Sequence, residues 1–364
     1  MKHMLNAIGK AALWALVAAL LLAGCSPAAN TPAPSEPQEP SSSQAPESVF
    51  PPTTPSVLSH PEALPQSALQ SPALAEVLAR GAAINGQDDA ATNKEVVQPF
   101  LQAVEAGQDA RLEVYSFWES LDADGTADRR LVGRVFENRG GTPYIYYLER
   151  YNWEGLPEEK SPEYKISSFE LTEYGYLVYH PESDSEASSV KVVHDEDIFE
   201  KAAERRQLYE KYVRPIYYSG ALGDNSWASP AELHASRIWL FEDLYYSEGR
   251  DPWKEFGEHW PVETMLEVLG RYFDGFTRQQ ILRERYADEY DSATDTIFYQ
   301  GGRGGGPFML RVTDWAQEGD RLALTYENYD YVTGRPYEGA VYRLTVGLLE
   351  DGSFRYLSNA VVEQ

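Results

Sequence analysis

The chain of 364 residues contains a single cysteine, Cys25. One thiol cannot form a disulfide within the chain, so the fold depends on packing and hydrogen bonds alone. A catalytic thiol after residue 25 is excluded for the same reason. Even in an oxidising compartment, no disulfide bond within the chain stabilises the fold.

Positive charge is scarce. The chain has 31 Lys and Arg residues against 57 Asp and Glu residues, a formal net charge of −26. Such a field repels nucleic acid, anionic lipid and anionic wall polymers, and we expect no nucleic-acid partner. Excess negative charge commonly serves solubility, so it does not by itself indicate a cationic substrate.

Signatures of catalysis are also lacking. The sequence has no Gly-x-Ser-x-Gly elbow and no His-Glu-x-x-His motif. The glycine run 301–306 lacks the Lys-Ser/Thr of a phosphate-binding loop, and we interpret it as a loop between strands. The alternative is a binding loop in which Arg303 contacts an anion. Sequence alone cannot single out a pair of catalytic carboxylates. We expect no cofactor and favour a non-catalytic protein.

The N-terminus has the charge pattern of a secretory leader. Lys2 and Lys10 precede an apolar run over residues 11–23, and no acidic residue occurs before Cys25. As a helix this run is about 20 Å long, which is too short to cross a hydrocarbon core of about 30 Å. The pattern therefore predicts a cleaved leader and not a spanning helix.

The apolar run ends with Leu22, Ala23, Gly24 and Cys25. This motif resembles the lipobox of bacterial lipoproteins. The resemblance implies that residues 1–24 are a signal peptide and that the Cys25 thiol carries a diacylglycerol. Two acyl chains anchor a protein stably, so we expect it on the extracytoplasmic face of the cell membrane. Loss of the two lysines in the leader makes the net charge −28. The alternative is an ordinary secretory signal with an incidental cysteine.

A change of composition follows the anchor. Residues 25–66 are rich in Pro, Ser, Ala, Glu and Gln and contain few large apolar side chains. Burial could not offset the entropy of ordering such a segment. We predict a disordered tether that lifts the rest of the chain off the bilayer. His60 falls within this predicted tether.

The remaining residues predict an α+β fold with two subdomains, 67–195 and 196–364, each with helices before an antiparallel meander. The first has a helix predicted over 93–106, in which Pro99 is an obstacle. Period-two patterns separated by turn residues predict its strands at 111–118, 130–138, 143–152, 164–171 and 174–179.

The second subdomain is predicted to have helices over 196–212 and 262–273. Strands are predicted at 296–300, 308–315, 321–328, 340–349 and 354–362, with Asp351 and Gly352 marking a hairpin. This order resembles the cystatin or NTF2-like roll. The C-terminal part, including residues 356–359, also resembles uncharacterised lipoproteins of Gram-positive bacteria. That resemblance implies a fold class and a cell-surface setting, and no activity.

Two acidic segments are candidates for metal binding. Asp122, Asp124 and Asp128 surround a glycine turn and could hold a hard cation such as Ca²⁺. The glutamate that completes a calcium loop is missing, which favours a solvated hairpin turn. His194 begins the run His194 to Asp197, a second candidate, for which a solvated helix start is the simpler interpretation.

Aromatic side chains are the remaining candidates for binding. Tyr146, Tyr151 and Trp153 cluster in one predicted strand and its exit, and Tyr329 and Tyr331 lie near a predicted hairpin. Exposed rings can stack on sugars or form the centre of a protein interface. The alternative is packing within the sheets, where aromatic residues are common.

These patterns favour a membrane-anchored, non-catalytic binding or adaptor module whose partner is a protein, a peptide or a glycan. The first alternative is an envelope hydrolase that uses carboxylates in the cavity of the roll. The second alternative is a small-molecule binder that uses the same cavity. A deep cavity with paired carboxylates would favour the hydrolase, and an exposed aromatic patch would favour the binding module.

Overall fold

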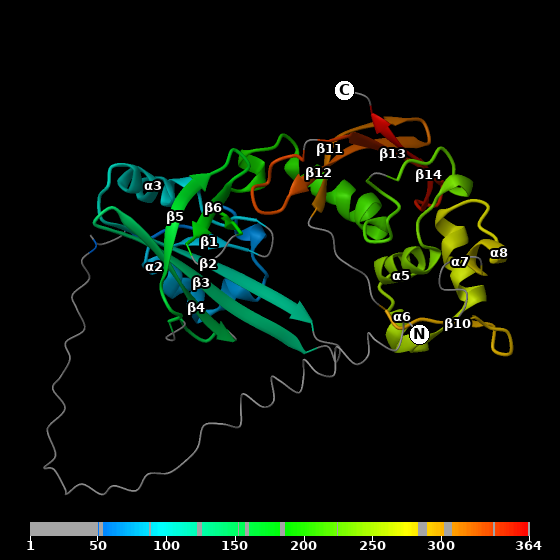
Figure 1. Cartoon of the computed structure of the whole chain (residues 1–364), viewed down its shortest axis with the longest axis horizontal. Helices are drawn as coiled ribbons and strands as arrows, with labels where there is room; N and C mark the ends of the chain where they lie inside the picture. The colour runs from blue at the N-terminus through cyan, green and yellow to red at the C-terminus, as the bar shows by residue number, and fades with distance from the viewer. Residues whose placement is uncertain are drawn as a thin grey trace, which may run out of the picture. The chain divides into compact units, whose positions relative to one another are not determined.

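The computed structural model describes the chain from residue 50 onward (Figure 1). The described residues are 50, 54–86, 89–121, 126–151, 153–156, 160–182, 186–223, 225–282, 290–301, 308–337 and 339–362. The predicted signal peptide, Cys25, Asp122, Asp124 and Arg303 lie outside these ranges. Among the described residues, no helix has the length and apolar character needed to span a membrane.

A seven-stranded sheet forms the first part of the fold, with its strands in chain order from β1 to β7 (Figure 1). The predicted strands are present, and each begins and ends within three residues of its expected position. Two short strands, β1 and β7, were not predicted. The strands are β1 Ala83–Asn85, β2 Ala110–Leu121, β3 Ala127–Arg139, β4 Thr142–Tyr151, β5 Tyr164–Leu171, β6 Tyr176–Pro181 and β7 Ser188–Lys191.

The edge of this sheet corrects the prediction of a purely antiparallel meander, because β1 pairs with β2 in parallel. A parallel pair needs a crossover, which here contains the 3₁₀ turn η3 (Lys94–Val96) and the helix α3 (Gln98–Glu105). The single helix predicted over 93–106 is thus divided. Pro99 lies in the first turn of α3, where a missing N–H costs nothing.

Both faces of the seven-stranded sheet are covered. Neighbouring residues on β3 belong to different core clusters, Val135 to the one that contains α2 (Pro72–Ala79) and Phe136 to the one that contains Phe100 of α3. Successive side chains of a strand point to opposite faces, so α2 and α3 pack on opposite sides. Each fully buried Val or Phe stabilises the fold by about 1.5–3 kcal/mol.

The predicted tether extends too far, since residues 54–66 belong to the folded part. The Ser56 N–H donates to the Leu78 carbonyl at 2.9 Å, and Leu58 forms a β-bridge with Thr92. Leu64 is buried next to a 3₁₀ turn, η1 (Pro61–Ala63). A few apolar side chains and backbone hydrogen bonds to α2 are enough to order this Pro-containing segment.

Helices follow the first sheet. The helix predicted over 196–212 is interrupted, because only residues 202–208 are α-helical and a π-helical turn follows. The amphipathic helix predicted over 262–273 is confirmed as α7. The elements are η4 Asp195–Asp197, α4 Ala202–Leu208, η5 Tyr209–Val213, η6 Arg214–Ile216, η7 Pro230–Glu232, α5 Arg237–Ser247, α6 Pro252–Phe256, α7 Val262–Tyr272 and α8 Arg278–Leu282.

A four-stranded antiparallel sheet ends the chain, in the order β11-β12-β13-β14. Its strands are β11 Phe308–Glu318, β12 Arg321–Asp330, β13 Val341–Leu348 and β14 Phe354–Val362. Along β13, Tyr342, Leu344 and Val346 are buried while the residues between them are partly or fully exposed. The buried face joins one core cluster with α5 and α7. This confirms an α+β fold and the predicted Asp351–Gly352 hairpin, where Gly352 has a φ of 84°.

A small three-stranded sheet combines one strand between α6 and α7 with two strands between α8 and the last sheet. Its strands are β8 His259–Pro261, β9 Tyr290–Asp291 and β10 Thr296–Phe298, in the order β8-β10-β9. β10 covers the first three residues of the predicted strand 296–300, and β8 and β9 were not predicted.

Candidate functional site

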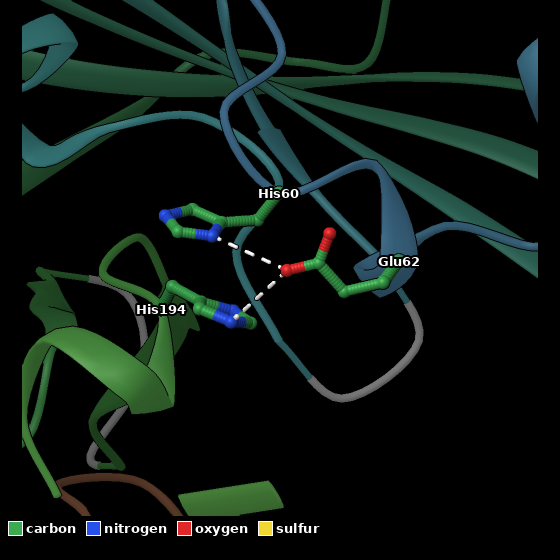
Figure 2. Close-up of side chains that lie close together, drawn as sticks. All are labelled: His60, Glu62 and His194. Carbon is green, nitrogen blue, oxygen red and sulfur yellow. Dashed lines mark hydrogen bonds and ion pairs between the residues drawn. The ribbon is translucent and has the colours of Figure 1, made fainter.

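Two histidines and one glutamate from distant parts of the sequence meet beside the first sheet (Figure 2). His60 precedes η1, and its backbone N–H donates to the Ala91 carbonyl at 3.1 Å. Glu62 lies within η1. His194 is the N-cap residue of η4, just after β7. The site therefore joins the segment before the sheet to the segment after it.

One nitrogen of each imidazole ring lies close to the same carboxylate oxygen of Glu62 (Figure 2). The Nδ1 atom of His60 lies 3.3 Å from Glu62 Oε1, and the Nε2 atom of His194 lies 3.4 Å from the same oxygen. The two imidazole rings stack with their centroids 3.9 Å apart and their planes 17° apart. Within the described ranges, this is the group of His, Asp or Glu residues whose ligand atoms all lie within 4.8 Å of one another.

A further carboxylate faces the far nitrogen of each ring. Asp89 Oδ2 lies 2.8 Å from His194 Nδ1, and Asp197 Oδ2 lies 3.5 Å from His60 Nε2. Neither ring nitrogen of His194 makes a well-directed hydrogen bond, although its side chain is only 1% exposed. The short contact with Asp89 is therefore mainly electrostatic.

Asp89 is also part of a buried charge network. Its carboxylate accepts from the backbone N–H groups of Ala90 at 2.9 Å and Asp195 at 3.1 Å. Lys191 Nζ contacts Asp195 and lies 3.8 Å from Asp89, and Arg206 reaches both carboxylates. Burial and the neighbouring Asp195 carboxylate raise the pKa of Asp89, and the Lys191 and His194 side chains oppose this shift.

The glutamate lies on the open side of the site. Its side chain is 59% exposed, while that of His60 is 19% exposed. Partial burial raises the pKa of Glu62, but a hydrogen bond from its own backbone N–H and the nearby histidines lower it more, so the net shift is downward. A solvent-facing carboxylate beside two imidazoles can bind a cation that arrives from water.

The predicted run His194 to Asp197 is divided by the structure. His194 and Asp197 face His60, whereas Asp195 pairs with Lys191 and Glu196 pairs with Arg206. The sequence therefore indicated one histidine of the site and one of its outer carboxylates. It missed His60 and Glu62, because both fell inside the predicted tether. Leu58 and Leu64, which flank them, were the available signal of an ordered segment.

The predicted calcium loop is described only at Asp128, which lies on β3. Its carboxylate accepts a hydrogen bond from Arg130 Nε at 3.0 Å. β2 and β3 pair antiparallel up to Leu121 and Ala127, on either side of the predicted turn. This pairing is what the hairpin interpretation requires.

Two of the five predicted aromatic binding residues are core residues. Tyr146 and Trp153 are each 5% exposed and belong to the core beneath α2. The prediction that they form an exposed binding patch is therefore wrong. Both Ile145 and Tyr146 on β4 are buried, so strand alternation does not mark Tyr146, which together with Trp153 is covered by α2. Tyr151 and Tyr331 are 62% and 55% exposed, and Tyr329 is partly exposed with the Arg311 guanidinium 4.9 Å from its ring centre.

A shallow hollow of about 290 Å³ lies between α4, η5 and β11. It is lined by Glu204, Gln207, Leu208, Lys211, Tyr212 and Trp315. Glu204 is the one carboxylate among these lining residues, so the hollow does not hold the carboxylate pair that the hydrolase alternative requires.

Comparison with protein-family models, with curated proteins and with solved structures finds no significant match to this chain.

Proposed function

We propose that the protein is a lipid-anchored lipoprotein of the extracytoplasmic membrane face that acts as a non-catalytic binding or adaptor module. The observation that carries this proposal is the Leu22-Ala23-Gly24-Cys25 motif at the end of a short apolar run. A thiol placed there can receive two acyl chains, which suffice for stable anchoring. The predicted tether, shortened to end before residue 54, would separate the anchor from the folded part.

The binding role is supported by where the charged and aromatic side chains lie. Buried Glu137 contacts both Arg111 and Arg139, so this carboxylate is paired within the fold. Tyr151 and Tyr331 are large apolar side chains left in solvent. Exposed tyrosines are common at the centres of protein and glycan interfaces, so we assign them to a protein, peptide or glycan partner at the cell surface.

The finer fold assignment belongs to the same proposal. We infer that α5, α7 and the sheet β11–β14 form a roll of the cystatin or NTF2-like type. Support comes from the one-sided burial of β13 and from the shared core of helices and sheet. A fold of this type hosts many functions, so it adds a scaffold and no activity.

Anchoring is tested by the Cys25→Ser variant of the full chain, expressed with labelled fatty acid. We expect the label to be lost and the protein to leave the membrane fraction. Ser26→Ala, which keeps the thiol, is the matched control and should label like the wild type. Unchanged labelling of Cys25→Ser would overturn the proposed anchor.

The binding role is tested by cross-linking the anchored chain to its neighbours in intact cells. We expect a defined cross-linked partner that is lost in Tyr151→Ala or Tyr331→Ala. Tyr218→Ala, another exposed tyrosine, is the control and should retain the partner. Equal capture by all three variants would remove the exposed tyrosines from the proposal.

A further inference from the structure

We propose that His60, Glu62 and His194 form a binding site for a divalent transition-metal ion of the Zn²⁺ class, a property separate from anchoring and from partner binding. Two imidazole nitrogens and one carboxylate oxygen are a known ligand set for zinc. Imidazole ligands favour zinc and its neighbours over Ca²⁺ and Mg²⁺, which prefer oxygen ligands only.

The two distances from the Glu62 oxygen to the imidazole nitrogens fit this ion, and the two nitrogens lie within 4.8 Å of each other. Metal–ligand bonds of about 2.0–2.2 Å make a tetrahedron whose edges measure about 3.3–3.6 Å. Glu62 Oε1 lies 3.3 Å from His60 Nδ1 and 3.4 Å from His194 Nε2. A charge-assisted hydrogen bond would be shorter, about 2.7–2.9 Å. The observed contacts are therefore long for hydrogen bonds and close to the edges of a zinc tetrahedron.

The outer carboxylates give the site a second layer typical of metal centres. A metal-binding histidine usually has its other ring nitrogen next to a carboxylate, which orients the ring and makes it a stronger ligand. Asp89 occupies this position for His194, and Asp197 occupies it for His60. Both rings therefore turn their remaining nitrogen toward Glu62 (Figure 2).

The burial of His194 supports a ligand role. Its side chain is 1% exposed, and neither ring nitrogen makes a well-directed hydrogen bond. A buried polar group without such a bond destabilises the fold, and a metal bond at Nε2 would offset this cost. Glu62 remains 59% exposed, which leaves an entry path and room for a water molecule as fourth ligand.

The charge around the site also favours a cation. Five carboxylates, those of Glu62, Asp89, Asp195, Glu196 and Asp197, surround it against two cationic side chains, Lys191 and Arg206. The chain as a whole carries −26, which raises the local concentration of cations.

Titration of the full chain in detergent with Zn²⁺ alone, after removal of bound metal by a chelator, tests the proposal. We expect one Zn²⁺ per chain by calorimetry. Glu62→Gln and His60→Gln should each weaken binding about tenfold or more, and Asp197→Asn should weaken it about 10–100-fold. His180→Gln, an exposed histidine on β6, is the matched control and should bind like the wild type. Glu62 is exposed, so its variant should fold normally.

A second measurement identifies the ligands. X-ray absorption of the Zn²⁺-loaded chain should show two imidazole nitrogens in the wild type and one in His60→Gln. Absence of Zn²⁺ binding, or equal affinity in the wild type, Glu62→Gln and His60→Gln, would overturn the proposal. Binding of Ca²⁺ with no binding of Zn²⁺ would do the same.

Discussion

Asp89 and His194 meet beneath the surface, with the Asp89 Oδ2 atom 2.8 Å from the His194 Nδ1 atom. Asp89 follows β1 and His194 follows β7, the two edge strands of the seven-stranded sheet. Their contact therefore connects the segments that follow the two edge strands. Burying a carboxylate is costly unless charges and hydrogen bonds compensate it. Lys191, Arg206 and two backbone N–H groups provide that compensation.

Replacing Lys191 by Met should destabilise the protein strongly. The lysine is 8% exposed and lies between the Asp89 and Asp195 carboxylates, so its loss leaves two negative charges facing each other. Breaking a buried pair typically costs 3–5 kcal/mol, and we expect about 2–3 kcal/mol because Arg206 remains. Urea unfolding followed by tryptophan fluorescence measures this difference.

Lys165→Met is the matched control for that experiment. Lys165 pairs with Glu182 on the surface, and both side chains are 48% exposed. A pair of this kind contributes little to stability, because water screens the two charges. If Lys191→Met unfolds at the same urea concentration as Lys165→Met, the buried lysine does not stabilise the Asp89 network.

Tyr326→Phe should show how much one buried hydroxyl contributes to the C-terminal sheet. The hydroxyl donates to Asn359 Oδ1 at 2.8 Å and accepts from the Gly223 N–H at 3.1 Å. Its removal leaves the buried Asn359 oxygen without this donor, which should lower the free energy of unfolding by about 1–3 kcal/mol. Thermal unfolding measured by circular dichroism reports the change.

Tyr331→Phe removes the same atom from an exposed ring and is the control. Its side chain is 55% exposed, so water replaces any partner of its hydroxyl and we expect a change within about 0.5 kcal/mol. Equal losses in the two variants would mean that the Tyr326 hydroxyl makes no special contribution.

The strands could be predicted because their signal is local. Alternation along β13 and the Asp351–Gly352 turn identify a hairpin from a few neighbouring residues, and the structure confirms both. The parallel strand β1 could not be found in this way. It spans only Ala83–Asn85, all three residues are buried, and so it has no alternation to detect.

The candidate site was harder to predict because its residues meet only through the fold. His194 stood out beside three acidic residues, but His60 and Glu62 lie in a Pro-containing segment whose composition resembles that of the predicted tether before it. What orders this segment is the hydrogen bonding of Ser56 and His60 to Leu78 and Ala91. Composition does not record such long-range contacts. The same limit applies to Tyr146 and Trp153, whose burial depends on α2.

Glu163→Gln should change how stability depends on pH. Arg139 and Lys160 lower the pKa of Glu163 to about 2 in the folded protein, from an ordinary value of 4.5. The carboxylate therefore stabilises the fold above pH 4.5, and this contribution is lost as the pH falls from 4.5 toward 2. The side chain is 33% exposed, so we expect the wild type to be more stable than the variant by at most about 1 kcal/mol at pH 6.

Urea unfolding at pH 6, 4 and 3 should show this difference in stability shrinking as the pH falls. Adding 1 M NaCl at pH 6 should reduce the difference as well, because the Debye length is then about 3 Å. A difference between wild type and variant that stays constant over this pH range would contradict the ion-pair explanation.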